Sequence, residues 1–502
     1  MLAEDRVPVI IGVGQVNDRP EHVADGLDST GLMLAALRVA EADSGVRILD
    51  KIEWLGVEDQ MSFRNPAHHL NLAGQLDKIP REVVRTYNAS GDGPVRLINE
   101  AANLIAAGRI TFAATTGGEA FRTATKRAQE EAWKNLGARN TDIMSEALAA
   151  FAMPHAKRYG MVTPSEIYPL YEQATRAAWG QTLSEAQAET GAIWEGNSKA
   201  AAANPHAWLR RERRAAEIIE PTADNRMINY PYTKLMVANS SVNQGAAVII
   251  TSLAAARALG IAEHRLIYVG HGAQAHERAD VFRRESFTDS KSMAVSIEKA
   301  LQFNDLTSNQ LDHVELYSCF PCVPKMVRRI LDWPIDRPHS VYGGLTFGGA
   351  PVGNCMMHAA AAMVEKLRAD HADAKGLIFG NGGFASHSHT IILSRRPGCD
   401  ADRPVDYDVQ AFADDRRGPA PEFLERYAGP GTIESFCMPY GRNGAPAYAA
   451  VVGRAPTGER FLAHVPGDDH RMLRFLAGEE GEPVGTAGMA MAMDDGRQRW
   501  TR

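Results

Sequence analysis

The chain has 502 residues, of which 45% are apolar and 23% charged, and its formal net charge is −7. This composition is ordinary for a globular protein of about three domains, and it excludes a small disulfide-stapled module and a nucleic-acid binder with a basic excess. The five cysteines are few and odd in number, so we expect no disulfide framework, at least one unpaired thiol and a cytoplasmic location.

Two features bear on the membrane and on export. The longest apolar run, residues 246–256, is about half of the length that spans a bilayer, and it contains Thr251 and Ser252. The first residues include Glu4 and Asp5 where a secretory signal would carry basic residues. We therefore expect neither a membrane contact nor an export signal.

A repeated series of elements predicts two similar halves. Four features occur twice in the same order: a buried strand ending in a Gly-x-Gly turn, a second buried strand, a helix that follows a proline, and an apolar strand closed by Gly-Gly. The first copies lie at 9–14, 49–55, 93–108 and 110–118, and the second copies at 266–272, 311–317, 350–367 and 377–383. Strands that alternate with helices in this way predict mostly parallel sheets covered on both faces.

Residues from about 121 to 240 differ in character from the repeat that they interrupt. They include helical stretches, the breaker Asn204-Pro205 and the basic run 210–214, and we interpret them as an excursion that lies over the core. The predicted first half therefore spans 1–262 with an insert at about 121–240, and the predicted second half spans 263–396.

The composition changes again after Arg396. Prolines and acidic residues at 397–404 predict a linker. Short apolar runs at 447–452 and 460–465 alternate with turns that are typical of hairpins. We predict a small, separate, antiparallel β domain over residues 405–502.

Two tandem halves with a large insert in the first resemble the thiolase superfamily, and local motifs agree with this. The shared motifs are a Gly-Gly turn, the segment that returns from the insert to the core, a Tyr-Ser-Cys-Phe run, and a Gly-Gly-Leu to Ala-Pro-Val-Gly segment. They lie at 117–120, 242–247, 317–320 and 343–353. Residues 225–236 and the extra C-terminal domain look most like the sterol-carrier-type thiolase-like proteins of type 1.

This resemblance covers residues 6–395 as a thiolase fold and the whole chain as the type 1 subgroup. It implies an α/β fold of two tandem βα halves, layered α-β-α-β-α, followed by a small antiparallel β-barrel domain. It also implies an enzyme of acyl-CoA or β-keto acid metabolism, related to acetyl-CoA acetyltransferases, with coenzyme A or an acyl-CoA as its substrate.

A thiolase cleaves a β-ketoacyl C–C bond with a cysteine thiolate, an activating histidine and a second cysteine. The resemblance places these groups within 88–93, at Ala350, and at Phe379 or Gly380, where this chain has none of them. We therefore expect C–C bond cleavage or formation of Claisen or retro-aldol type without the usual thiolase cysteine.

Five side chains remain as candidates for this reaction. His387 and His389 follow the second Gly-Gly turn, and strand alternation would point both to one side as general acids or bases. The resemblance gives Tyr317 the place of an oxyanion-hole or proton-transfer residue, with Cys319 two residues later, and Ser90 is a replacement nucleophile. A hydrogen-bonded core tyrosine and a packed core cysteine are the plainer alternatives.

Three further features have plain interpretations. Asp92 precedes the helix at Pro94 and is expected to cap it. The His-x-His pair has a metal-ligand spacing but no third ligand nearby, so we expect no metal site. The pair His68-His69 lacks a supporting pattern and is expected to pack or to face solvent.

Arg210, Arg211, Arg213 and Arg214 have two interpretations. They form a solvated helix face, or, as the resemblance implies, they bind the phosphates of coenzyme A, for which guanidinium groups are suited. The sequence has no Walker loop and no complete dinucleotide fingerprint, so neither ATP nor NAD is expected.

Two other classes of function stay open. In the first, the chain is a non-catalytic acyl-CoA-binding or partner subunit. This alternative arises because some thiolase-like aldolases need a small acyl-CoA-binding companion chain. Alternatively, Cys319 and Cys322 form a Cys-x-x-Cys pair that predicts a dithiol redox protein. The sequence is compatible with a monomer and with a homodimer.

Overall fold

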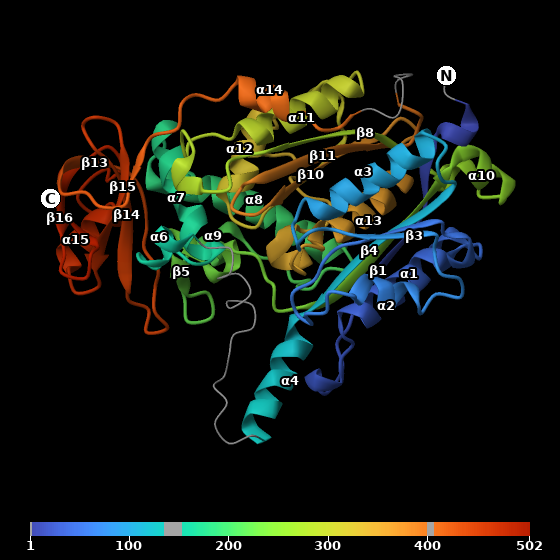
Figure 1. Cartoon of the computed structure of the whole chain (residues 1–502), viewed down its shortest axis with the longest axis horizontal. Helices are drawn as coiled ribbons and strands as arrows, with labels where there is room; N and C mark the ends of the chain where they lie inside the picture. Colours follow the sequence, from blue (N-terminus) through green and yellow to red (C-terminus); the bar gives the residue numbers. More distant parts are fainter. Residues whose placement is uncertain (1–2, 135–152, 399–405) are drawn as a thin grey trace.

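The computed structural model of the chain describes residues 3–134, 153–398 and 406–502. In these residues nine strands form one sheet in the order β3-β2-β4-β7-β1-β8-β11-β10-β9 (Figure 1). At its centre, β1 (Pro8–Asn17) and β8 (Ile267–His276) pair antiparallel through two residue pairs. Counted outward from this pair, corresponding strands follow in the same order on both sides, which agrees with the predicted duplication.

The remaining strands of the sheet divide between the two halves. The first half adds β2 (Trp54–Val57), β3 (Glu82–Arg85), β4 (Phe112–Ala120) and β7 (Asn243–Ser252), and the second adds β9 (His313–Leu316), β10 (Lys375–Gly382) and β11 (His387–Ser394). In each half one inner strand, β7 or β11, is antiparallel to both of its neighbours. The prediction of mostly parallel pairing is therefore wrong, because one reversed strand makes two pairings antiparallel.

The strands of the two halves form two of five layers, and four helices form the other three. α1 (Ser29–Ser44) covers the outer face of the first half and α11 (Lys291–Phe303) that of the second. α3 (Gly93–Ala106) and α13 (Cys355–Arg368) contact strands of both halves and lie between them. The layering α-β-α-β-α that the resemblance implied is thus confirmed.

The predicted Gly-x-Gly turn after the first strand is wrong. β1 continues through Gly12 and Gly14, and a Cβ at Gly14 would lie 2.1 Å from the carbonyl oxygen of Ala36 in α1. These glycines therefore allow a close approach of strand and helix. The apolar face of α1 then packs on β1, β4 and β7.

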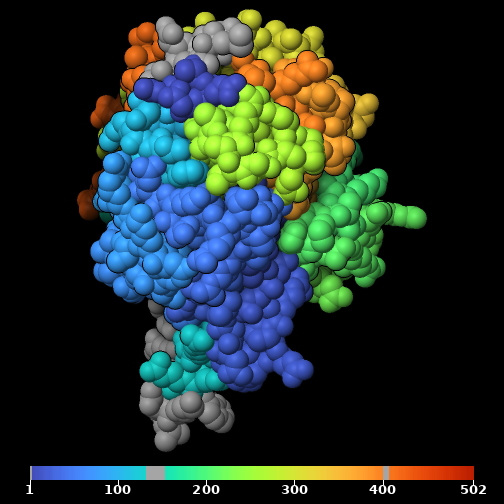
Figure 2. All heavy atoms as spheres, turned by 90° about the vertical axis from the view of Figure 1, so that its right-hand side faces the viewer, coloured from blue at the N-terminus to red at the C-terminus, as the bar shows by residue number. Residues whose placement is uncertain are grey.

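The segment between β4 and β7 is mainly helical, as expected for the insert. It contains α4 (Phe121–Lys134), α6 (Pro154–Lys157), α7 (Pro164–Ala178), α8 (Leu183–Ala203), α9 (Ala215–Ile219), β5 (Met227–Asn229) and β6 (Tyr232–Thr233). Capping boxes start α7 and α8, and α4 projects from the body (Figures 1 and 2). The short helices α2 (His68–Ala73), α10 (Leu253–Ala258) and α12 (Cys322–Ile330) lie in the two halves.

The C-terminal region is a small β-barrel, as predicted. It contains α14 (Gln410–Asp415), β12 (Phe423–Leu424), β13 (Gly429–Cys437), β14 (Tyr448–Arg454), β15 (Arg460–Pro466), α15 (His470–Leu476), β16 (Ala487–Ala492) and β17 (Gln498–Thr501). Five of the described strands close a ring, β13-β14-β15-β17-β16. The pairing is antiparallel except that β15 is parallel to β12 and to β17.

The predicted domain limits, 1–262 with an insert at about 121–240, 263–396 and 405–502, stay predictions. Residues 399–404 of the predicted linker, and residue 405 of the predicted β domain, lie outside the described part of the chain. None of the described helices is both long and apolar enough to cross a membrane.

Candidate active site

A cavity of about 400 Å³ lies where the two halves meet the insert. Its wall consists of the turn before α3, residues 163–165, residues 237–240, the segments after β9 and before α13, and the loop after β10. The lining is mainly apolar. The side chains of the lining that could take part in a reaction are Ser90, Tyr317, Cys319, Cys355 and His387. Four of the five candidates from the sequence thus line one cavity, and His389 does not.

The turn before α3 and the start of β11 bring three polar side chains together. Ser90 Oγ donates a hydrogen bond to Asp92 Oδ1 and lies 3.5 Å from His387 Nδ1. Asp92 Oδ1 lies 3.7 Å from the same nitrogen of His387. These three residues, which we call the Ser90–Asp92–His387 cluster, combine a hydroxyl, a carboxylate and an imidazole at one wall.

Asp92 is not a side-chain cap, although it is the N-cap residue of α3. Its backbone is already helical, with φ −86° and ψ −19°, and its carboxylate accepts no hydrogen bond from the first turn. A capping side chain normally sits on an extended residue, from which it reaches the free amides. The expected cap is therefore wrong, and the carboxylate serves Ser90 and His387 instead.

The charge state of Asp92 follows from its neighbours. Burial by itself would raise the pKa of this carboxyl, but the nearby His387 imidazole, together with the Ser90 hydroxyl, holds the pKa well below its ordinary 3.8. Asp92 is thus ionised at neutral pH. A fixed carboxylate beside a histidine orients the imidazole.

Glu58 is a site residue that the sequence reasoning missed. It follows β2, is fully buried, and its Oε1 accepts a hydrogen bond of 2.8 Å from the amide of Ser90. Burial raises the pKa of Glu58 well above 4.5, and the nearby charge of Asp92 adds to this, so both effects favour the protonated form of Glu58. Two carboxyl groups whose pKa values are shifted in opposite directions therefore flank Ser90, and an acid at the end of an apolar strand was the available signal.

Tyr317 and Cys355 lie at the opposite side of this turn. The Tyr317 ring lies against the backbone of Gly91, where a Cβ would come within 2.3 Å of Cε2. Cys355, which the sequence reasoning also missed, begins α13 and lines the same cavity as Tyr317. Burial raises the pKa of Cys355 well above 9.0 and that of Cys319 to about 12. Both thiols are therefore protonated at neutral pH and neither is a thiolate nucleophile.

The Cys-x-x-Cys pair does not have the properties of a redox dithiol. Cys319 and Cys322 are free thiols, and Cys322 is fully buried, with its Sγ 3.6 Å from the carbonyl oxygen of Tyr168. Burial raises the pKa of Cys322 well above 9.0. A redox pair needs an accessible thiol of lowered pKa, so the structure opposes the dithiol alternative.

His389 lies on the same face of β11 as His387, as alternation predicted, but it does not reach the cavity. It is fully buried beneath α3, where Asn99 Nδ2 lies 3.0 Å from its Nε2, and its ring packs against that of Tyr407. Burial lowers the pKa of His389 to about 3, so the imidazole is neutral. The expectation that His389 acts as acid or base is therefore corrected, because α3 and Tyr407 cover it.

The arginine run is not on a helix. Residues 210–214 are non-helical and connect α8 to α9, because the amides of Trp208 and Leu209 bond the carbonyls of Gly348 and Phe347. Arg213 and Arg211 pair with Glu217 at 3.0 and 3.8 Å. None of Arg210, Arg211, Arg213 and Arg214 lines the cavity. Likewise, no three His, Cys, Asp or Glu side chains of the described residues form a cluster that would hold a metal ion.

Comparisons with known proteins agree with this architecture. No curated protein matches the chain in sequence. The family model of the thiolase-like protein type 1 additional C-terminal domain matches residues 408–495, which contain most of the barrel. The crystal structure of a monomeric SCP2-thiolase-like protein type 1 from Mycobacterium smegmatis is similar over 99% of both chains, with 28% identity and a TM-score of 0.82.

Two more distant structures share the fold of the two halves alone. The Ltp2-ChsH2(DUF35) aldolase has 16% identity and a TM-score of 0.58 over 78% of this chain and 98% of its own. Human mitochondrial 3-ketoacyl-CoA thiolase in complex with CoA has 15% identity and a TM-score of 0.56 over 78% of this chain and 99% of its own. With the match of the barrel and the full-length similarity to the mycobacterial protein, these findings support the family of thiolase-like proteins of type 1 with an additional C-terminal domain.

Proposed function

We propose that the protein binds a β-hydroxyacyl or β-ketoacyl compound, free or as a coenzyme A thioester, and makes or breaks its C–C bond without a cysteine nucleophile. The observation that carries this proposal is the Ser90–Asp92–His387 cluster at the wall of a mainly apolar cavity. An ionised Asp92 beside His387 provides the orientation that a general base needs.

Retro-aldol cleavage suits this set of groups better than thiolytic cleavage. It needs a base and a donor for the enolate, whereas thiolytic cleavage needs a nucleophile, and the thiols of Cys319 and Cys355 are protonated. His387 takes the proton of the β-hydroxyl group as the Cα–Cβ bond breaks. The bonding electrons pass to the enolate, which is then protonated at carbon, and the β-carbon leaves as a carbonyl.

Tyr317 is proposed as the donor to the enolate oxygen. Burial raises the pKa of Tyr317 well above 10, so its hydroxyl keeps its proton at neutral pH and can donate a hydrogen bond. Cys319 keeps its proton for the same reason and lines the same cavity. Ser90 would become the nucleophile if the reaction is of Claisen type, since its hydroxyl lies beside both Asp92 and His387.

Coenzyme A is proposed as the carrier of the acyl group. The human thiolase and the Ascaris suum Acat5 thiolase, which share the fold, are described as complexes with coenzyme A. Arg210, Arg211, Arg213 and Arg214 stay candidates for its phosphates. Among the described residues Arg211 and Arg213 pair with Glu217, whereas the side chains of Arg210 and Arg214 form no ion pair. A small companion chain, as the name of the aldolase complex indicates for that protein, is an additional proposal.

The test is incubation of the purified protein with β-hydroxyacyl-CoA and β-ketoacyl-CoA thioesters and the free acids, followed by mass spectrometry of products and of the intact protein. A retro-aldol enzyme yields a carbonyl fragment and a shortened acyl compound, and no adduct on the protein. An acyl adduct that is lost in Ser90→Ala supports the Claisen route. If no compound is cleaved, with or without coenzyme A, the proposal fails.

A non-catalytic acyl-CoA-binding role is the second candidate. The protonated thiols and the absence of a cysteine before α3 favour it. Calorimetric titration with acyl-CoA thioesters separates the two candidates. Tight binding without turnover supports this second role, whereas cleavage of a bound thioester contradicts it.

A further inference from the structure

The loop between β10 and β11 carries a residue in an unusual conformation. Ala385 has a φ of 55°, in the left-handed region that non-glycine residues rarely adopt. Its neighbours Phe384 and Ser386 line the cavity, and His387 follows directly. Since such a conformation persists only where the surroundings hold it, the question is which groups hold residues 383–386.

Side chains from outside the hairpin hold this loop. Tyr168 of α7 accepts a hydrogen bond of 3.1 Å from the amide of Ala385 and donates one of 3.0 Å to the carbonyl of Gly383. Arg284 donates to the carbonyls of Phe384 and Ala385 at 2.9 and 3.0 Å, and to the Ser386 hydroxyl at 2.7 Å. Arg284 is only 5% exposed, so it is fixed while it holds three consecutive residues.

The C-terminal barrel in turn holds the backbone that carries Arg284. Arg460, at the start of β15, is fully buried and donates to the carbonyls of Phe282 and Arg284 at 2.7 and 2.6 Å. Glu434 of β13 balances its charge with two hydrogen bonds of 2.7 and 2.6 Å. Buried charge-assisted bonds of this kind are strong and directional. The barrel therefore reaches the cavity loop in two steps, through Arg460 and then Arg284.

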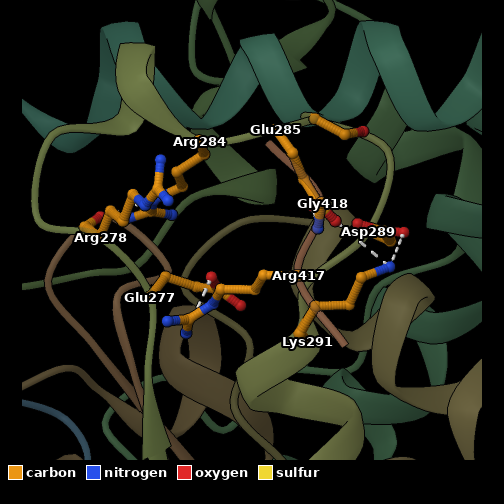
Figure 3. Close-up of a pocket in the computed structure, with 9 residues that line it drawn as sticks. Glu277, Arg278, Arg284, Glu285, Asp289, Lys291, Arg417 and Gly418 are labelled. Atoms are coloured by element: carbon orange, nitrogen blue, oxygen red, sulfur yellow. Dashed lines mark hydrogen bonds and ion pairs between the residues drawn. The ribbon is translucent and has the colours of Figure 1, made fainter. Parts of the chain in front are cut away.

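The junction itself has no room for a ligand. Figure 3 shows Arg284 beside Arg278, Glu285 next to Gly418, and Arg417 beside Glu277, with Lys291 near Asp289. Carboxylates pair with the cations there, as Glu277 does with Arg417 at 3.2 Å. The gap that these residues line is about 20 Å³, which is enough for about one water molecule. The junction is thus a fixed mechanical contact.

We propose that the C-terminal barrel is a positioning domain for the cavity: Arg460 fixes residues 282–285, Arg284 fixes residues 383–386, and this places His387 beside Asp92. Arg284 and Arg460 are positioning residues. Only the catalytic purpose of placing His387 beside Asp92 rests on the proposed function. The mechanical link itself is independent of any reaction.

Hydrogen exchange in the full chain tests the link. In Arg460→Met, amide exchange over residues 382–388 is expected to rise roughly tenfold or more, the factor that loss of one bond to a charged donor produces. Leu473→Ala is the control, since it opens space in the buried barrel core while keeping the junction. Measured below its own unfolding transition, it is expected to leave exchange over 382–388 unchanged.

A second pair of variants keeps the test within one segment. Arg284→Lys retains the charge but loses the fork that spans residues 384–386, so it is expected to raise exchange over 382–388 as Arg460→Met does. Arg283→Ala changes the adjacent arginine, whose side chain is 58% exposed, and is expected to change nothing there. Unchanged exchange in Arg460→Met, or an equal rise in Leu473→Ala, overturns the proposal.

Activity gives a separate readout. If a substrate is cleaved, Arg460→Met is expected to lower kcat more than it raises KM, because the general base is displaced while the cavity remains. Equal activity of Arg460→Met and the unaltered protein, despite faster loop exchange, also overturns the positioning role. Failure to find any substrate leaves the exchange result decisive for the link, so the two proposals fail separately.

Discussion

The starts of α3 and α13 are corresponding points of the two halves, and both lie at the cavity. At the start of α3, Ser90 contacts the ionised Asp92 and Glu58, a carboxyl of raised pKa. At the start of α13, Asn354 donates a 2.7 Å hydrogen bond to the carbonyl of Gly117, and Cys355 offers a neutral thiol. The duplicated scaffold thus places carboxyl groups on one wall and uncharged groups on the other.

The largest effect is expected when the proposed general base beside Ser90 and Asp92 is removed. His387→Gln is expected to lower kcat on the compound that the protein cleaves by roughly 10²- to 10⁴-fold, the usual contribution of a general base. Steady-state kinetics measures this, with the thermal unfolding temperature as the control for folding. A loss of less than about threefold would remove His387 from the reaction.

Asp92→Asn sharpens the comparison through pH. Because the pKa of Asp92 is lower in the folded protein than its ordinary 3.8, its ionisation stabilises the fold above about pH 4, and this is lost as pH falls below it. As pH falls below 4, the free energy of unfolding of the unaltered protein is therefore expected to decrease by about 1.4 kcal/mol per pH unit more than that of Asp92→Asn. Urea unfolding at several pH values measures the difference.

The same variant is also expected to lower kcat, since the imidazole of His387 loses the carboxylate beside it. Parallel acid-unfolding curves for the two proteins would contradict the lowered pKa of Asp92. A full kcat in Asp92→Asn would instead contradict its role toward His387.

Glu58→Gln tests whether the second carboxyl is protonated. An amide has nearly the shape of a protonated carboxyl, so the free energy of unfolding at pH 5 is expected to change by less than about 1 kcal/mol. A carboxyl of raised pKa makes the folded state less stable as pH rises above its ordinary 4.5, and Glu58→Gln is expected to abolish that decline. If the unaltered protein shows no such decline between pH 5 and 8, Glu58 is ionised and the assignment is wrong.

The smallest effect is expected on the α13 side. Cys355→Ala removes a neutral thiol, and it is expected to change kcat by less than about threefold, since no step needs this sulfur as a nucleophile. Alkylating reagents are likewise expected to react slowly with this buried thiol. If Cys355→Ala lost as much activity as His387→Gln, the reaction would depend on the α13 wall, contrary to the proposal.

Sequence patterns located much of the site but not its geometry. Ser90, Tyr317, Cys319 and His387 stand next to glycine turns or strand ends, and these positions, together with the resemblance to thiolases, led to residues that line one cavity. The two buried groups, Glu58 and Cys355, were missed because an acid at a strand end or a cysteine at a helix start does not by itself show which other elements meet there.

The sequence by itself determined the duplication, the alternation of strands and helices, and the barrel that follows, because apolar periodicity and turn residues act over a few neighbouring positions. Only the tertiary structure decided that His387 faces the cavity and His389 does not, since Asn99, 290 residues away, covers the latter. It also decided that Arg460 holds the backbone of Arg284, 176 residues away. Burial and long-range hydrogen bonds depend on which elements meet, and that information is not local.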